Sequence, residues 1–92
     1  MGFEWDEENK AGINFRKHGV RMPEAIPVFA DPYGITITDD ESDPGEQRFV
    51  TLGIGAAGRL LVVVYTWRAK NIRIISARPA EVHEREEYEA EL

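Results

Sequence analysis

The sequence predicts one α+β domain over residues 1–92, with an antiparallel sheet of about four or five strands, two N-terminal helices and one C-terminal helix. Two β-branched runs, Leu60–Tyr65 and Ile72–Ile75, are joined by a short polar turn, which is typical of a hairpin in the middle of a sheet. Helix signals flank this hairpin on both sides. Ninety-two residues are enough for one hydrophobic core and leave no room for a second.

The N-terminal third predicts a strand followed by two helices. Aromatic residues alternate on one side of a short first strand, Gly2–Trp5. Asp6 is a good N-cap for the first helix, which ends at Gly19, a residue that can take the left-handed C′ conformation. A second, shorter helix covers Pro23–Ala30. We expect it to start late or to kink at Pro27, because proline lacks a backbone N–H.

The rest of the chain predicts two more strands, an acidic loop and a last helix. The strands are Gly34–Thr38 and Arg48–Ile54, and the loop Asp39–Glu46 between them carries Pro–Gly punctuation. The last helix is expected from Pro79 to Glu91. Its apolar residues make a poor stripe, so it is either weakly docked or in need of a partner.

Two patterns that can mark a ligand site do not predict one here. Residues 53–58 match G-x-G-x-x-G, but a strand follows where dinucleotide binding needs a helix, and Arg78 stands where that site needs an acid. His18 and His83 are sixty-five positions apart and cysteine is absent, which argues against a metal site. We therefore expect neither a cofactor nor a metal.

Charge is distributed unevenly along the chain. The net charge is −6, yet residues 47–80 hold six basic side chains and no acid. This asymmetry predicts a basic face for a polyanion within an acidic body. The alternative is that these cations are solvated side chains that protect strand edges from aggregation.

The chain also carries signals about its compartment. The N-terminus is acidic and lacks the apolar segment of a signal peptide. The longest apolar run, Leu60–Tyr65, is far too short to span a membrane. Because cysteine is absent as well, we expect a soluble cytoplasmic protein without membrane contact.

Candidates for phosphate chemistry lie in the basic segment and at the end of the first helix. His18 is a candidate general base or acid near neutral pH, with Lys17 beside it as the other candidate. A helix-capping role is the alternative for His18. Arginines can hold a phosphate through bidentate hydrogen bonds and stabilise the charge that grows on it. The candidate arginines are those of the predicted sheet: Arg48, Arg59, Arg68, Arg73 and Arg78.

Strand alternation restricts the arginines further. Arg73 and Arg78 fall on opposite faces of a regular strand. One of them is therefore expected to be structural, holding a carboxylate such as Glu84 or a helix end. We favour Arg73 for the site.

These residues resemble the BrnT family, the toxin half of a bacterial type II toxin–antitoxin pair. The matching segments follow the family's order over nearly the whole chain and include FEWD (Phe3–Asp6), RKHGV (Arg16–Val20), VF-x-DP (Val28–Pro32), GR-x-L-x-VVYT-x-R (Gly58–Arg68) and RIISAR (Arg73–Arg78). The chain departs from the pattern in two places. The spacing between Trp5 and Asn14 is one residue longer than expected, which can shift the first helix, and Pro27 replaces a helix former.

The resemblance implies a fold like the RelE ribonucleases and a small endoribonuclease that cleaves RNA and halts translation. It also implies neutralisation by a BrnA-type antitoxin that carries the DNA-binding module, so that operator DNA is reached only through the antitoxin. The matched segments contain Lys17, His18, Arg48, Tyr65, Arg68 and Arg73.

Chemistry then assigns the roles. Lys17 or His18 is expected to deprotonate the 2′-hydroxyl of RNA, so that no metal is required. Arg48, Arg68 and Arg73 are expected to neutralise the phosphorane. The expected RNA contacts are Arg59, Tyr65, Lys70 and Arg78, with Tyr65 stacking on a base or hydrogen-bonding to it. Two rivals remain: a non-catalytic module that docks an acidic partner or nucleic acid, and an interaction domain that has lost its activity.

Overall fold

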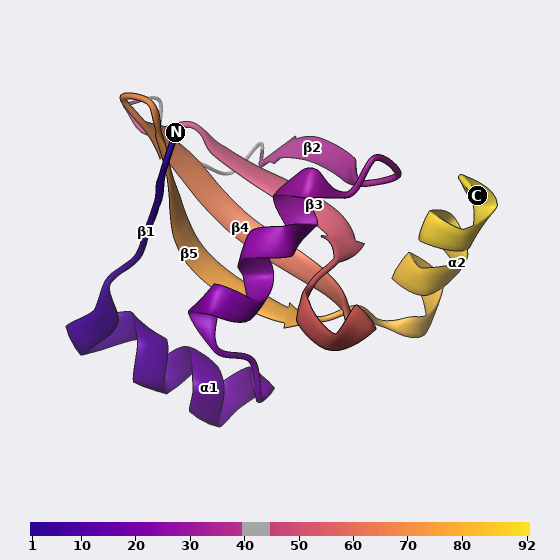
Figure 1. The fold of residues 1–92 in the computed structure, drawn as a ribbon, viewed down its shortest axis with the longest axis horizontal. Helices are drawn as coiled ribbons and strands as arrows, with labels where there is room; N and C mark the ends of the chain where they lie inside the picture. The colour runs from indigo at the N-terminus through magenta and orange to yellow at the C-terminus, as the bar shows by residue number, and fades with distance from the viewer. Residues whose placement is uncertain (40–44) are drawn as a thin grey trace.

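The computed structural model describes residues 1–39 and 45–92, which form a five-stranded sheet with helical segments around it (Figure 1). Most of the predicted acidic loop, residues 39–46, lies outside the described residues. The strands are β1 (Phe3–Glu4), β2 (Ile35–Asp39), β3 (Arg48–Ile54), β4 (Leu60–Arg68) and β5 (Asn71–Pro79). The helical segments are η1 (Glu7–Ala11), α1 (Gly12–His18), η2 (Met22–Ala30), η3 (Ala56–Gly58) and α2 (Val82–Ala90).

The strand order is β1-β5-β4-β3-β2. The sheet is mixed, whereas the sequence predicts an antiparallel sheet. Strands β2 to β5 are antiparallel neighbours in chain order, which confirms the central hairpin. β1 lies parallel to β5, with Phe3 beside Ile72 and Glu4 beside Arg73. The prediction was wrong at this edge because no hairpin joins β1 to its neighbour. Almost the whole domain separates the two strands in the chain, so no local turn fixes their relative direction.

The first helix begins after Asp6, as predicted, but its first turn is wider than an α-helical turn. The Asp6 carboxylate accepts a hydrogen bond from the backbone N–H of Asn9 at 3.0 Å. The backbone N–H of Ala11 donates to the carbonyl of Asp6, five residues back, at 3.0 Å. η1 is therefore a π-helical turn, and it takes up the extra residue that the sequence places in this helix. The helix ends at Gly19 with φ of 67°, the left-handed cap that the sequence predicts.

The second helical segment, η2, is a 3-10 helix. Pro27 lies inside it. The sequence predicts a late start or a kink at this residue, and the structure has the tighter winding of a 3-10 helix instead. Ala25 and Val28 are buried against the sheet.

A β-bulge at Ile75 changes which side chains of β5 share a face. The register of β5 against β4 shifts by one residue there, opposite the step from Val64 to Tyr65. The bulge reverses the alternation between Arg73 and Arg78, so both side chains project from the same face of the sheet. The prediction that strict alternation separates them was wrong.

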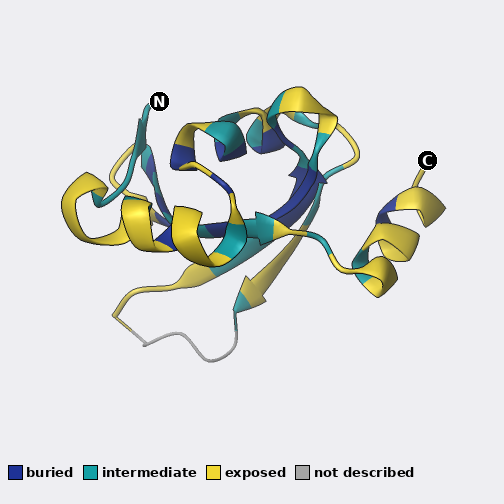
Figure 2. Cartoon of the chain, turned by 90° about the horizontal axis from the view of Figure 1, so that it is seen from below, coloured by how far each residue is buried: buried dark blue, intermediate teal, exposed yellow. Residues whose placement is uncertain are grey.

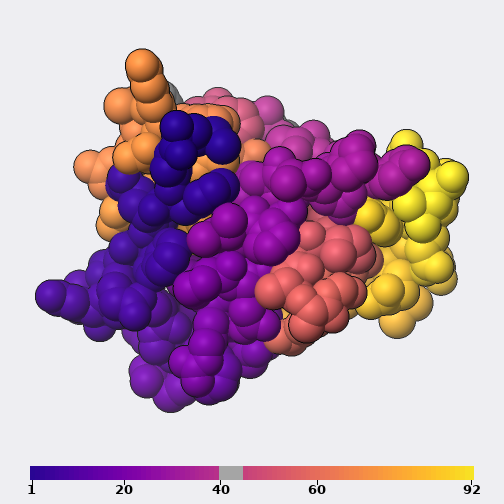
Figure 3. All heavy atoms as spheres, viewed as in Figure 1, coloured from indigo at the N-terminus to yellow at the C-terminus, as the bar shows by residue number. Residues whose placement is uncertain are grey.

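The N-terminal helical segments cover one face of the sheet, called here the front face, and α2 stands on the other, the rear face (Figure 2). The main core lies between the front face of the sheet and the N-terminal helical segments. Leu61, Val63 and Ile74 are almost fully buried there. In Figure 3 the N-terminal segments cover the middle of the molecule and α2 stands at its side. Among the described residues, no helix covers the end of the rear face that is remote from α2.

α2 starts later than predicted. Pro79 is the last residue of β5, and the helix begins at Val82 after the N-cap Glu81. The side chain of Tyr88 anchors α2. It packs on the rear face in a cluster with Leu52, Leu60 and Val62, and it donates a hydrogen bond of 2.6 Å to Asp31. That bond raises the pKa of Tyr88 to about 12, because it favours the protonated phenol beside a carboxylate.

Candidate functional site

Five residues line up across the rear face, one from each strand. In the order of the strands from β2 to β1 they are Asp39, Arg48, Thr66, Arg73 and Glu4. Cross-strand partners project from the same face of a sheet, so these side chains form one row, called here the charged row. Strands lie about 4.8 Å apart, which puts the backbones of Arg48 and Arg73 roughly 10 Å from one another. Two arginine side chains at that separation can converge on one phosphate.

The structure brings Arg48, Arg68 and Arg73 together, as the sequence predicts. Arg68 projects from the same face two residues beyond the buried Thr66, and its Nε lies 3.9 Å from Oε1 of Glu4. Nη1 of Arg73 lies 3.2 Å from that same oxygen. Surface ion pairs contribute about 0–1 kcal/mol, so a phosphate can compete for the guanidinium groups.

Acidic side chains share this site, which the sequence did not predict. Residues 47–80 contain no acid, but the fold adds Glu4 from β1, and Glu46 lies 3.8 Å from Nε of Arg48. The predicted face of purely positive charge is therefore a mixed one. The reason is the parallel pairing of β1 with β5, which carries an acidic segment from the far end of the chain to the arginines.

A small groove of about 160 Å³ runs beside Arg48 and Arg73 to the first helical turn, where Asp6 and Lys10 line it. The hydrogen bond from the backbone N–H of Asn9 is the main cause that holds the pKa of Asp6 below its ordinary value, and the charges of Arg73 and Lys10 add to it. Lys10 is exposed and adds a cation to the site. Both residues belong to the helix start, where the sequence signalled only capping.

Arg59 and Arg78, two of the expected RNA contacts, are held by the fold. Arg78 donates two hydrogen bonds of 2.8 Å to Glu84 and so ties β5 to α2. Arg59 donates to Oε1 of Glu24 at 3.2 Å and to the carbonyl of Gly19 at 3.1 Å. The structural role that the sequence reserved for one of the two β5 arginines therefore falls to Arg78.

Lys17 and His18 are not brought to the arginines. They end α1, and the next residue, Gly19, accepts the hydrogen bond from Arg59 at the start of β4. The charged row crosses β4 at Thr66, near its other end. At about 3.3 Å per residue, the seven residues from Arg59 to Thr66 span roughly 23 Å, and α1 covers the front face while the row lies on the rear one.

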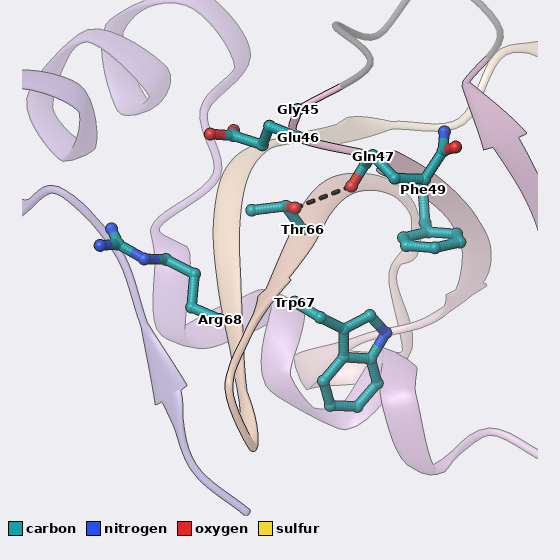
Figure 4. Close-up of a pocket in the computed structure, with 7 residues that line it drawn as sticks. All are labelled: Gly45, Glu46, Gln47, Phe49, Thr66, Trp67 and Arg68. Atoms are coloured by element: carbon teal, nitrogen blue, oxygen red, sulfur yellow. Dashed lines mark hydrogen bonds between the residues drawn. The ribbon is translucent and has the colours of Figure 1, made fainter.

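Tyr65, an expected RNA contact, is buried, whereas Trp67, two residues later, is exposed. Tyr65 is 6% exposed, packs edge-on against Phe29 and shares a hydrogen bond of 2.9 Å with Thr51, so its ring belongs to the core. Trp67 is 48% exposed. It lines a groove of about 560 Å³ with Phe49 and Arg68, in which the aromatic rings and the arginine lie on opposite sides (Figure 4).

Three residues of the site were missed by sequence reasoning. Glu4 lies in the recognised FEWD segment, but only the parallel strand pairing shows that it faces the arginines. Trp67 lies two residues after Tyr65, and Lys10 lies four residues after the N-cap Asp6. Neither position signals in the sequence that the side chain lies near the arginines.

Lys70, an expected RNA contact, is exposed at the tip of the β4–β5 hairpin.

Among residues 1–39 and 45–92, no group of three or more histidine, cysteine or acidic side chains lies close enough together to hold a metal ion. No helix in that part of the chain is long and apolar enough to cross a membrane.

Comparison with known proteins identifies the family. The model of the family described as "Ribonuclease toxin, BrnT, of type II toxin-antitoxin system" matches residues 5–84. The fold is similar to the 1.1 Å crystal structure of the Brucella abortus ribonuclease toxin BrnT, with a TM-score of 0.65 and 20% identity over 88% of this chain and 97% of that one. No curated protein matches the chain in sequence. With its family match over most of its length, the chain belongs to the BrnT ribonuclease toxins of type II toxin–antitoxin systems, a membership that implies an antitoxin partner.

Proposed function

We propose that the chain is an endoribonuclease that cleaves RNA at the charged row and thereby inhibits translation. The observation that carries the proposal is the convergence of Arg48, Arg68 and Arg73 on one end of the rear face, which no helix of residues 1–39 and 45–92 covers, in a chain of a ribonuclease family. Three guanidinium groups can bind a phosphodiester and neutralise the extra negative charge of its pentacoordinate transition state.

The proposed reaction is an attack by the neighbouring 2′-hydroxyl of RNA on phosphorus. A base removes the proton of that hydroxyl, the 2′-oxygen bonds to phosphorus, and the bond to the 5′-oxygen breaks. The 5′-oxygen leaves with the bonding electrons and takes a proton from solvent water. The products are a 2′,3′-cyclic phosphate and a 5′-hydroxyl, and the reaction needs no metal.

The groove beside Trp67 supports contact with single-stranded RNA. The exposed ring of Trp67 offers a surface on which a base can stack, next to Arg68 for the backbone. Lys70 at the hairpin tip extends the cationic path. Lys17 and His18, with Arg59 beside them, lie too far away for proton transfer at the row and are assigned to contact with a flanking part of the RNA.

The proposed biological setting is that of the family. We propose that a BrnA-type antitoxin neutralises the chain in the cytoplasm and alone carries the contact to operator DNA. The likeness to RelE ribonucleases is part of the same proposal.

The test is an RNA-cleavage assay with product analysis. The purified chain is incubated with RNA in the presence and absence of EDTA, and product ends are identified by mass spectrometry. We expect cyclic-phosphate ends and EDTA-insensitive cleavage. Products with 5′-phosphate ends, or cleavage that stops with EDTA, would overturn the mechanism. Binding without cleavage would favour the rival, a non-catalytic docking module in which glutamates hold the arginines.

A further inference from the structure

Proton transfer at the charged row needs a base, and the arginines cannot supply one, since guanidinium groups stay protonated near neutral pH. Both histidines are described by the structure and both lie elsewhere. His18 ends α1 on the front face, and His83 is an exposed residue of α2. Among residues 1–39 and 45–92, the carboxylates beside the arginines of the row are Glu4, Asp6, Asp39 and Glu46.

Geometry separates these four carboxylates. Asp39 lies on the edge strand β2 at the far end of the row, three strands or roughly 14 Å from Arg73. Asp6 is committed to its helix cap through hydrogen bonds from Asn9, and these bonds lower its pKa and make it a poorer base. Glu46 is an exposed side chain at the rim, 3.8 Å from Arg48 alone. Glu4 lies in the row itself and contacts both Arg68 and Arg73 through one oxygen.

Glu4 also retains capacity to accept a proton. A carboxylate has about four acceptor positions on its two oxygens. Oε1 accepts from Arg73 at 3.2 Å and lies 3.9 Å from Arg68, and Oε2 accepts from the side-chain amide of Asn71 at 3.3 Å. These contacts leave one position open. If the two arginines turn to a bound phosphate, further positions are freed next to the group that must lose its proton.

We propose that Glu4 is the general base of the ribonuclease reaction, an inference that rests on the proposed function. Its carboxylate takes the proton of the 2′-hydroxyl while the 2′-oxygen bonds to phosphorus and the 5′-oxygen departs, to be protonated by water. Glu4 then returns its proton to solvent. Before substrate binds, the same carboxylate neutralises Arg68 and Arg73 and holds them side by side.

The test compares Glu4→Gln with Glu4→Asp and with the matched control Glu46→Gln, which neutralises the other glutamate paired with an arginine of the site. Glutamine keeps the size of Glu4 and one acceptor oxygen but not its charge or basicity. We expect Glu4→Gln to lower kcat for a short oligoribonucleotide by about 100-fold or more, in line with the usual contribution of a general base. Its affinity for a non-cleavable 2′-O-methyl oligonucleotide and its melting temperature should stay close to those of the parent.

The pH dependence separates a base from a positioning residue. In the parent and in Glu46→Gln, cleavage should fall at acid pH as the base is protonated, and Glu4→Gln should lose this acid limb. Glu4→Asp should recover part of the activity and keep the limb. The inference is wrong if Glu4→Gln cleaves within threefold of the parent. If Arg73→Ala is inactive in that same assay, the proposed function still stands. A parent chain that cleaves no RNA would overturn both.

Discussion

Arg78 and Glu84 are joined by two hydrogen bonds of 2.8 Å, one from each terminal nitrogen of the guanidinium group to each oxygen of the carboxylate. This pair is the polar link between the end of β5 and α2, a helix with one buried apolar anchor, Tyr88. It lowers the pKa of Glu84 to about 2, mainly through the hydrogen bonds from Arg78.

Stability should therefore depend on pH through Glu84. Its pKa in the folded chain, about 2, lies below the ordinary value of 4.5, so the unfolded chain binds more protons between these values. The stabilisation is complete above about pH 5 and is lost as the pH falls towards 2. Glu84→Gln should lower the free energy of unfolding at pH 7 by about 1–2 kcal/mol, and the difference from the parent should vanish near pH 2. Thermal unfolding at both pH values checks this, with the exposed Glu86→Gln as the control; an equal loss at both values would contradict it.

Asn14 should be a main determinant of the position of α1. Its buried side-chain amide accepts from the N–H of Ala77 at 3.0 Å and donates to the carbonyls of Ala77 and Val20 at 2.9 Å. β1 covers β5 only at Ile72 and Arg73, so Asn14 takes the place of a strand partner further along β5.

Asn14→Ala leaves these backbone groups unpaired in the interior and should lower the free energy of unfolding by about 2–3 kcal/mol. Urea denaturation measures the loss. The neighbouring Ile13→Ala, at a 43% exposed position, should change the midpoint little. A small effect of Asn14→Ala would show that the amide does not fix the helix.

Trp67 rather than Tyr65 should contact RNA. Trp67→Ala is expected to weaken binding of a single-stranded oligoribonucleotide by about 1–3 kcal/mol, the usual contribution of one stacked base, without loss of stability. Tyr65→Phe removes the hydrogen bond to Thr51 inside the core, so it should lower stability by about 1 kcal/mol and leave binding unchanged. Fluorescence anisotropy and thermal melting separate the two. The opposite pattern would return Tyr65 to the site.

Much of the fold could be predicted because its signals are local. The β4–β5 hairpin, the caps at Asp6 and Gly19 and the strand Arg48–Ile54 each follow from a few adjacent residues. The only sign of the π-helical turn in the sequence was one extra residue between Trp5 and Asn14. The direction of β1 was not predictable, because strand pairing across almost the whole chain is decided by packing rather than by a turn.

The site was predicted in part for the same reason. Arg48, Arg68 and Arg73 lie on neighbouring strands of a meander, and the structure brings them to one face of the sheet. Their part in the reaction stays a prediction. The bulge at Ile75 has no sequence signal, and it decides the face of Arg78. The positions of Glu4 and His18 depend on long-range packing. This packing brings Glu4 to the arginines and places His18 far from them.

The central claim is that chemistry takes place at the charged row and not at the end of α1. The most direct test measures kcat/KM for cleavage of one oligoribonucleotide by Arg73→Ala and His18→Ala, with melting temperatures as the check on folding. Arg73→Ala should lose at least about 100-fold, as expected when charge stabilisation of a transition state is removed, and His18→Ala should stay within a few-fold of the parent. If His18→Ala abolishes cleavage while Arg73→Ala retains it, the site lies elsewhere on the molecule.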